Sequence, residues 1–205
     1  MLIDISGRTD IINYYSEWMF KRFEEGWVLS RNSLFPNSVR RYELTPDKVD
    51  CLLFGSKNYA PVLGRMHEIT ERFATYFDYT ITAYGKDIEP GVPDIDTSID
   101  TFLSLAKIVG PQRMAWRYDP ILLTEKYTVQ RHLETFDYIS GSSIGCRING
   151  CRVKWLISPA STSKGTPCVL ICGILGASLP RRRSCTAAFS PALPDLREQT
   201  DLQWM

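Results

Sequence analysis

Charged side chains follow four apolar, strand-like segments of this chain. The four clusters are Arg8 with Asp10, Lys57 with Asn58, Lys86 with Asp87, and Arg117 with Asp119. All of these residues except the amide Asn58 are candidate catalytic residues. The planar fork of an arginine suits phosphate or carboxylate, and a lysine adds a compact positive charge. These residue types therefore predict a site that binds an anionic substrate, either a small molecule or a nucleic acid.

The elements that must position these clusters form a repeating strand and helix pattern. The apolar segments cover residues 2–5, 52–54, 79–82 and 114–116, and a helical pattern follows each of them. In a parallel α/β array the carboxyl ends of all strands lie at one rim, where such folds place their chemistry. We therefore expect the clusters to converge, provided that the strands are parallel.

Apolar residues at three- to four-residue spacing mark the four helices. They are Ile11, Tyr15, Trp18 or Met19, and Phe23; Val62, Met66, Ile69 and Phe73; Ile99, Phe102, Ala106 and Val109; and Val129, Leu133 and Phe136. Residues 27–31 and 39–44 flank the turn Pro36-Asn37-Ser38, which predicts an inserted β-hairpin. Its arginines, Arg31, Arg40 and Arg41, either extend the basic side of the rim or are solvated hairpin residues.

Several of the clustered residues also have a purely structural interpretation. Asp10 precedes an apolar helix, where a carboxylate commonly caps the first turn. Arg8 points either to solvent or into the mouth of the barrel. Arg117 and Asp119 form either part of the site or an internal ion pair.

The third cluster belongs to a loop that contains the candidate ligand-binding residues Tyr84 and Glu89. The loop leads into Pro90-Gly91-Val92-Pro93, and two prolines around a glycine restrict the backbone, so we expect a rigid loop over the rim. Alternatively, this loop is only a stiff connection between two elements, and its charged side chains are solvated. Lys57 and Asn58, the latter a further candidate ligand-binding residue, are alternatively turn residues.

The composition is that of a globular protein and shifts near residue 140. The 205 residues carry a formal net charge of +1, which gives no global attraction to nucleic acid or acidic membranes. Residues 1–140 contain 20 acidic and 16 basic residues and have a net charge of −4. Residues 141–205 contain 3 acidic and 8 basic residues and have a net charge of +5, which brings the chain to +1. We expect a partial barrel domain over 1–140, and over 141–205 a poorly ordered tail rich in Cys, Arg and Ser, which a frameshift would explain.

Other motifs narrow the possibilities. His67 and His132 lie in helical patterns away from the strand ends, which argues against a histidine-based catalyst or zinc site. The sequence has no P-loop, dinucleotide fingerprint or nucleophile elbow. The start is not a secretory signal and the longest apolar stretch, 169–179, is too short to span a bilayer, so we expect a cytoplasmic protein with no membrane partner. The oligomeric state does not follow from the sequence.

Several motifs in order resemble an uncharacterised bacterial family, domain of unknown function 1848. They are ISGRTDI, YYSEWMFKRFEEG, VLSRN, FGSKNYAP, TAYGKDIEPGVP and WRYDPILL, within residues 1–140. The resemblance implies a radical S-adenosylmethionine-like enzyme with a (β/α) barrel-type fold. It also implies S-adenosylmethionine as cosubstrate and a [4Fe–4S] cluster on a CxxxCxxC motif near the C-terminus.

The chain departs from this family pattern at the cysteines. Cys168 and Cys172 supply the first half of the motif as candidate metal ligands, but Leu175 stands where the third cysteine is expected, and Cys185 is too distant. Three thiolates on one short loop are what the cluster requires. The chain is therefore expected to bind neither cofactor and to be a truncated, inactive form of such an enzyme. The alternative is a metal-free phosphate- or nucleic-acid-binding module, or a hydrolase, with the same rim.

Overall fold

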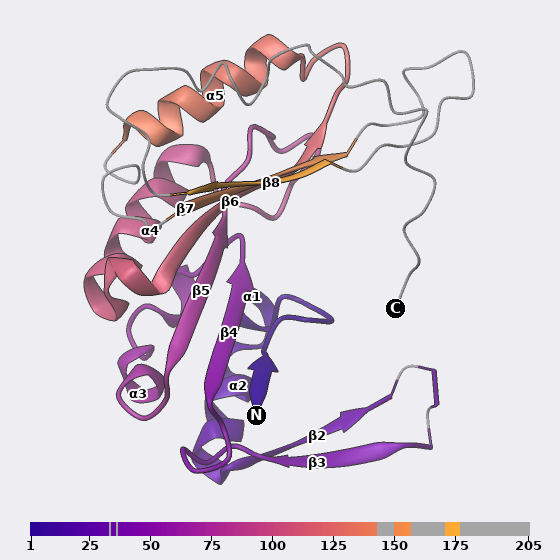
Figure 1. Ribbon diagram of the computed structural model, residues 1–205, viewed down its shortest axis with the longest axis vertical. Helices are drawn as coiled ribbons and strands as arrows, with labels where there is room; N and C mark the ends of the chain where they lie inside the picture. Colours follow the sequence, from indigo (N-terminus) through magenta and orange to yellow (C-terminus); the bar gives the residue numbers. More distant parts are fainter. Residues whose placement is uncertain (33, 36, 143–149, 157–170, 177–205) are drawn as a thin grey trace.

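A six-stranded sheet forms the framework of the molecule (Figure 1). The computed structural model describes residues 1–32, 34–35, 37–142, 150–156 and 171–176. Its strands follow the spatial order β1-β4-β5-β6-β7-β8 and are β1 (Leu2–Asp4), β4 (Cys51–Ser56), β5 (Thr75–Thr80), β6 (Met114–Leu122), β7 (Gly150–Leu156) and β8 (Ile171–Gly176). All neighbours from β1 to β7 are parallel, and β8 is antiparallel to β7.

The parallel α/β class and the orientation of the four predicted strands are thus confirmed. β1 and β8 are the two edges of this sheet, so its closure into a barrel stays a prediction. The tail predicted over 141–205 lies outside the described residues, apart from residues 141–142, β7 and β8. Among the described residues, no helix has the length and apolar character needed to cross a membrane.

All four predicted strands differ in extent from their predicted ranges, and β5 and β6 differ most. β5 begins at Thr75 and ends at Thr80, and its buried Phe77 and Tyr79 alternate with the partly exposed Tyr76 and Asp78. This alternation conceals the strand from a search for continuous apolar residues. β6 continues past residue 116 to Leu122, so Arg117 and Asp119 lie within the strand instead of following it.

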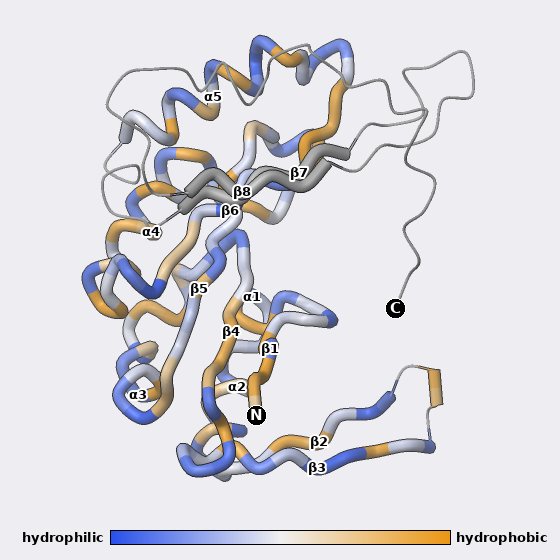
Figure 2. Tube along the Cα trace, in the orientation of Figure 1, coloured by the Kyte–Doolittle hydropathy of each residue, from blue (hydrophilic) through white to orange (hydrophobic). Residues whose placement is uncertain are grey.

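The helices pack on one face of the sheet. They are α1 (Ile11–Tyr14), α2 (Ser16–Glu25), the 3₁₀ turn η1 (Ala60–Val62), α3 (His67–Thr70), α4 (Ile95–Val109), the 3₁₀ turn η2 (Pro111–Arg113) and α5 (Val129–Gly141). Trp116 of β6 stacks on Phe136 of α5 with ring centroids 4.8 Å apart, and Tyr79 of β5 contacts Phe102 of α4 at 5.7 Å. Figure 2 shows hydrophobic and hydrophilic stretches alternating along α5, as in an amphipathic helix.

The first helical pattern is divided in two. Tyr15, with φ −136°, separates α1 from α2, and Gly26 ends α2 in the left-handed conformation with φ 76°. The break resets the helical phase, so Tyr15 of the predicted apolar face is exposed and Ile12 is buried instead. Of the two alternatives Trp18 and Met19, the structure buries Met19.

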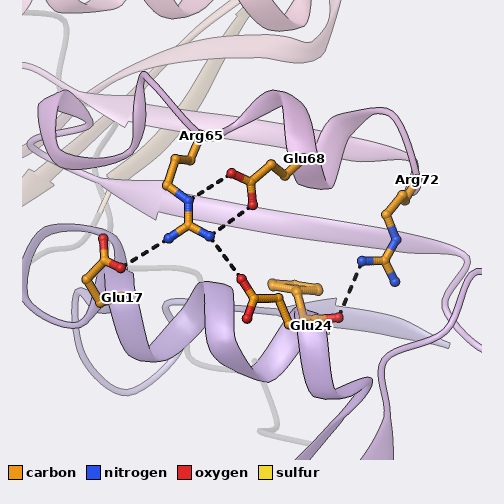
Figure 3. A network of polar contacts seen from close by, with 6 residues as sticks. Glu17, Glu24, Arg65, Glu68 and Arg72 are labelled. Atoms are coloured by element: carbon orange, nitrogen blue, oxygen red, sulfur yellow. Dashed lines mark hydrogen bonds and ion pairs between the residues drawn. The ribbon is translucent and has the colours of Figure 1, made fainter.

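One arginine links α2 to the segment that follows η1 (Figure 3). The guanidinium of Arg65 contacts Glu68 at 2.8 Å, and Glu17 and Glu24 of α2 at 3.1 Å each. It also lies 4.2 Å from the ring centroid of Phe20, a buried residue of α2. This network holds two segments together that are more than 40 residues apart in the chain.

The inserted hairpin is confirmed as β2 (Trp27–Arg31) paired with β3 (Val39–Glu43), and it projects away from the sheet (Figure 1). Arg31 and Arg40 are exposed. Arg41 is exposed as well and stacks on Trp27, with 4.7 Å between guanidinium and ring centroid. The hairpin arginines therefore match the solvated alternative and do not line the rim pocket described below.

α5 buries a histidine in place of a predicted apolar residue. Val129 is exposed, whereas His132, Phe136 and Ile139 are buried. Nε2 of His132 lies 3.2 Å from the carbonyl oxygen of Leu122, which can only accept a hydrogen bond. Nδ1 is then left to accept from the hydroxyl of Tyr118, 3.0 Å away. The histidine thus has a structural role between α5 and β6.

Burial lowers the pKa of His132 below its ordinary value, because the charged imidazolium is disfavoured in the core. The unfolded chain therefore binds a proton that the folded chain resists, and stability is lost as pH falls below the unfolded pKa of about 6.5. We expect the melting temperature to drop between about pH 7 and pH 5, and His132→Asn to flatten this dependence. His67→Gln, at an exposed histidine, is the control and should retain the wild-type profile. An unchanged profile in His132→Asn would contradict the assignment.

Candidate functional site

A pocket of about 450 Å³ lies at the carboxyl ends of the parallel strands. Its lining combines side chains from β1, β4, β5 and β6 with the segments that follow β1 and β4: Asp4, Ser6, Asp10, Leu53, Phe54, Gly55, Ser56, Lys57, Asp78, Thr80, Arg117 and Asp119. In β5 and β6 the lining residues alternate with those that pack against the helices, because successive side chains of a strand point to opposite faces. The pocket therefore opens on the face that the helices do not cover.

Arg117 and Asp119 of β6 form the central ion pair of this pocket. Being two residues apart, they share one face of the strand, and Nη2 of Arg117 lies 2.6 Å from Oδ2 of Asp119. Burial opposes the charge on Arg117, but the hydrogen bond to Asp119 and the charge of Asp78 outweigh it and raise the pKa of the guanidinium. Arg117 thus stays charged, and its fork of five N–H donors exceeds what Asp119 uses.

Asp10 is both a helix cap and a wall of the pocket. Its Oδ1 accepts a hydrogen bond from the backbone N–H of Asn13 at 3.0 Å, and its Oδ2 accepts from the hydroxyl of Ser56 at 2.7 Å. Asn58 donates to the side chain of Asn13 at 2.9 Å and accepts from the N–H of Ala60 at 3.0 Å. Both interpretations of Asp10 hold together, and Asn58 serves to join the segments after β1 and β4.

Lys57 lines the pocket, and its ammonium group forms an ion pair with Glu89. The second carboxylate oxygen of Glu89 accepts a hydrogen bond from the hydroxyl of Thr82 at 3.0 Å. Glu89 itself is not part of the pocket lining. The predicted loop after β5 therefore reaches the rim through Glu89.

Other residues of this loop bind the loop to the rest of the molecule. Asp87 contacts Lys126 at 2.9 Å and accepts a hydrogen bond from the hydroxyl of Tyr127 at 2.7 Å. Its pKa is lowered, first by the hydrogen bond from Lys126 and then by that from Tyr127. Lys86 donates to the carbonyl oxygen of Val92 within the loop. Neither Lys86 nor Asp87 lines the pocket.

Tyr84 and Arg8 also lie outside the pocket lining. The hydroxyl of Tyr84 donates to the carbonyl oxygen of Pro120 at 2.8 Å and accepts from the N–H of Leu122 at 2.6 Å, and burial raises its pKa to about 12. It therefore anchors the loop to β6. Arg8 is exposed and donates to the carbonyl oxygen of Arg31 in the hairpin.

Five polar residues of the pocket were not predicted: Asp4, Ser56, Asp78 and Thr80, which lie within strands, and Ser6, which follows β1. The available signal was an acidic residue at an alternate position of an otherwise apolar strand, as in Phe77-Asp78-Tyr79. Together with Asp10 and Asp119, the residues Asp4 and Asp78 bring the number of carboxylates in the pocket lining to four. The lining contains two cations, Lys57 and Arg117, so its formal charge is −2.

The described part of the chain offers no group of three His, Cys, Asp or Glu side chains placed to hold a metal ion. Among the residues whose side chains are described there is one cysteine, Cys51, at the start of β4 and away from the pocket lining. Cys168 lies outside the described residues, and Cys172 is a residue of β8.

Comparison with known proteins gives one result. A family model described as Domain of unknown function (DUF1848) matches residues 2–158, about three quarters of the chain. No curated protein and no solved structure matches. The match covers β1 to β7 and hence every residue of the pocket.

The double role of Asp10 predicts a measurable loss of stability on its removal. Asp10→Ala deletes the cap of α1 and one of the two acceptors of the Ser56 hydroxyl, so we expect the free energy of unfolding in urea to fall by about 1 to 2 kcal/mol. Asp10→Asn retains a capping oxygen and should lose less. Asp94→Ala, which removes the cap of α4 outside the pocket, is the matched control and should cost a similar amount. An Asp10→Ala protein as stable as wild type would contradict the assignment.

Proposed function

Since the chain belongs to the DUF1848 family, a domain family of unknown function, we propose a function from its pocket: it binds a small polar substrate at the carboxyl rim of the sheet. Arg117 and Lys57 hold an anionic group of this substrate. The observation that carries the proposal is the convergence of six charged side chains, from four parallel strands and the segments that follow them, on a single pocket. Its volume of about 450 Å³ suits a small molecule.

The donors of Arg117 support an anion site. Its side chain is 35 % exposed, so a ligand can reach it while Asp119 keeps the guanidinium in place. Arginine binds carboxylate and phosphate through two parallel hydrogen bonds, which also fixes the orientation of the ligand. Lys57, 27 % exposed, adds a second positive charge at the rim.

The excess of carboxylates restricts the class of substrate. A purely anionic ligand would meet a pocket with a formal charge of −2. We therefore propose a ligand that combines one anionic group with hydroxyl or ammonium groups, which Asp4 and Asp78 can accept. Nucleic acid is disfavoured as a ligand, because proteins that bind it present extended basic surfaces and this pocket is acidic.

Iron–sulfur chemistry, which the family resemblance implies, does not fit the thiols of this chain. A [4Fe–4S] cluster that leaves one iron open for S-adenosylmethionine needs three thiolates on a compact loop. Cys168 and Cys172 are followed by Leu175 at the third position. In the register of β7 and β8, Cys172 pairs with Lys154 and Cys151 with Leu175, which puts the two cysteine positions three residues apart along the ladder. We propose that this chain binds its substrate without radical chemistry.

The same rim supports a second candidate, a metal-free hydrolase. An ionised aspartate can serve as general base for an attacking water, and Asp4 is an exposed carboxylate in the pocket lining. The excess of carboxylates over cations favours this chemistry over simple anion storage.

Removal of Arg117 tests the binding proposal, with inorganic phosphate as probe in a phosphorus NMR titration. Arg117→Gln leaves Asp119 buried without its partner, so the double variant Arg117→Gln/Asp119→Asn, which removes both charges, is measured beside it. We expect both to bind phosphate at least about tenfold more weakly than wild type. Arg40→Gln, in the exposed hairpin, is the matched control and should bind like wild type. A folded double variant with wild-type affinity would overturn the proposal.

Anaerobic reconstitution with iron and sulfide tests the absence of the cluster. We expect no charge-transfer absorption and no iron retained after desalting, since the third thiolate is missing from the motif. Phosphate binding should persist in the same sample. Iron retained by the chain and lost in Cys168→Ala/Cys172→Ala would show instead that the cysteine pair recruits a further ligand.

A further inference from the structure

Lys57 differs from Arg117 in that its internal partner lies outside the pocket. We infer that Glu89 is a specificity-determining residue: it acts as an internal counter-ion that the anionic group of a ligand must displace from Lys57. The inference rests on the proposed function, because it concerns the affinity of the same pocket for anions. It assigns to Glu89 a role in positioning Lys57 instead of a direct contact with the ligand.

The ion pair is well sheltered. The side chain of Glu89 is 14 % exposed and that of Lys57 is 27 % exposed, so water screens their attraction less than it screens a surface pair. Lys57 belongs to the pocket lining and Glu89 does not. The ammonium group is therefore shared between an internal carboxylate on one side and the pocket on the other.

Glu89 cannot follow Lys57 toward a ligand, because several hydrogen bonds hold it. Its Oε2 accepts from the hydroxyl of Thr82 at 3.0 Å, and its backbone N–H donates to the carbonyl oxygen of Gly85 at 2.9 Å. Gly85 in turn donates its N–H to the hydroxyl of Tyr127 at 2.9 Å. The carbonyl oxygen of Glu89 accepts from the N–H of Val92 at 3.2 Å. The carboxylate is thus fixed within the loop, whereas Lys57 has a flexible four-carbon stem.

This asymmetry has a consequence for selectivity. A ligand that recruits Lys57 must weaken its pair with Glu89, and the free energy of that pair is subtracted from the free energy of binding. A simple anion has no hydroxyl or ammonium groups that could bind the aspartates of the pocket, so nothing offsets this cost and the anion is bound weakly. A ligand whose hydroxyl or ammonium groups also bind the aspartates offsets the cost. Glu89 therefore favours substrates of mixed character over simple anions.

Neutralising Glu89 tests the inference through a gain of binding. Glu89→Gln keeps an oxygen that can accept from Thr82 but removes the charge that holds Lys57. We expect the affinity for inorganic phosphate, measured by the same phosphorus NMR titration, to rise roughly five- to tenfold. Lys57→Met should bind more weakly than wild type, and Lys57→Met/Glu89→Gln should show no gain over Lys57→Met. Glu71→Gln, at an exposed glutamate beside α3, removes the same formal charge and should leave the affinity unchanged.

The possible outcomes separate this inference from the proposed function. If wild type binds phosphate through Arg117 and Glu89→Gln binds it equally or more weakly, the role of Glu89 is overturned and the pocket stands. If neither wild type nor Glu89→Gln binds phosphate, both fail. A residue that merely braces the loop would lower both affinity and melting temperature when changed. A higher affinity that depends on Lys57 is the result that only a counter-ion produces.

Discussion

The alternation of side chains along parallel strands is the constraint on which this molecule depends. In β5 and β6 every second residue packs against the helices, as Phe77, Tyr79, Trp116 and Tyr118 do. The residues between them face the other side, and because the strands are parallel their polar ends meet at one rim. Core and pocket are therefore two faces of the same strands, and a shift of register by one residue would exchange them.

Short-range signals explain which parts of this arrangement the sequence could predict. Asp10 before an apolar helix, Gly26 after it and the Pro36-Asn37-Ser38 turn are local features, and they mark a helix start, a helix end and a hairpin. The parallel order followed from the repeated strand and helix pattern. The rim position of Asp10, Lys57, Arg117 and Asp119 followed in turn from that order.

The remaining features depend on contacts that no local pattern encodes. The break at Tyr15 changes which side of α2 is buried, and His132 enters the core because Tyr118 and Leu122 complete its hydrogen bonds. Asp78 stands between two buried aromatic residues, so a search for charges after strands passes over it. Conversely, the charge density of the loop at Lys86 and Asp87 predicted site residues, but these side chains are occupied in bracing the loop. Similar residue types thus line the pocket at one position and brace a loop at another.

The outer edge of β1 affects the tendency of the protein to aggregate at high concentration, because β1 is an edge strand of the sheet. An unpaired strand edge invites other chains to extend the sheet, and a long, flat edge is a seed for fibres. β1 is only three residues long, and its N-terminal ammonium group is engaged with Asp50. The hairpin beside it presents Arg31, Arg40 and Arg41, so that approaching copies of the chain repel each other there. The short length of β1 and the like charges of the hairpin together limit uncontrolled polymerisation at this edge of the sheet.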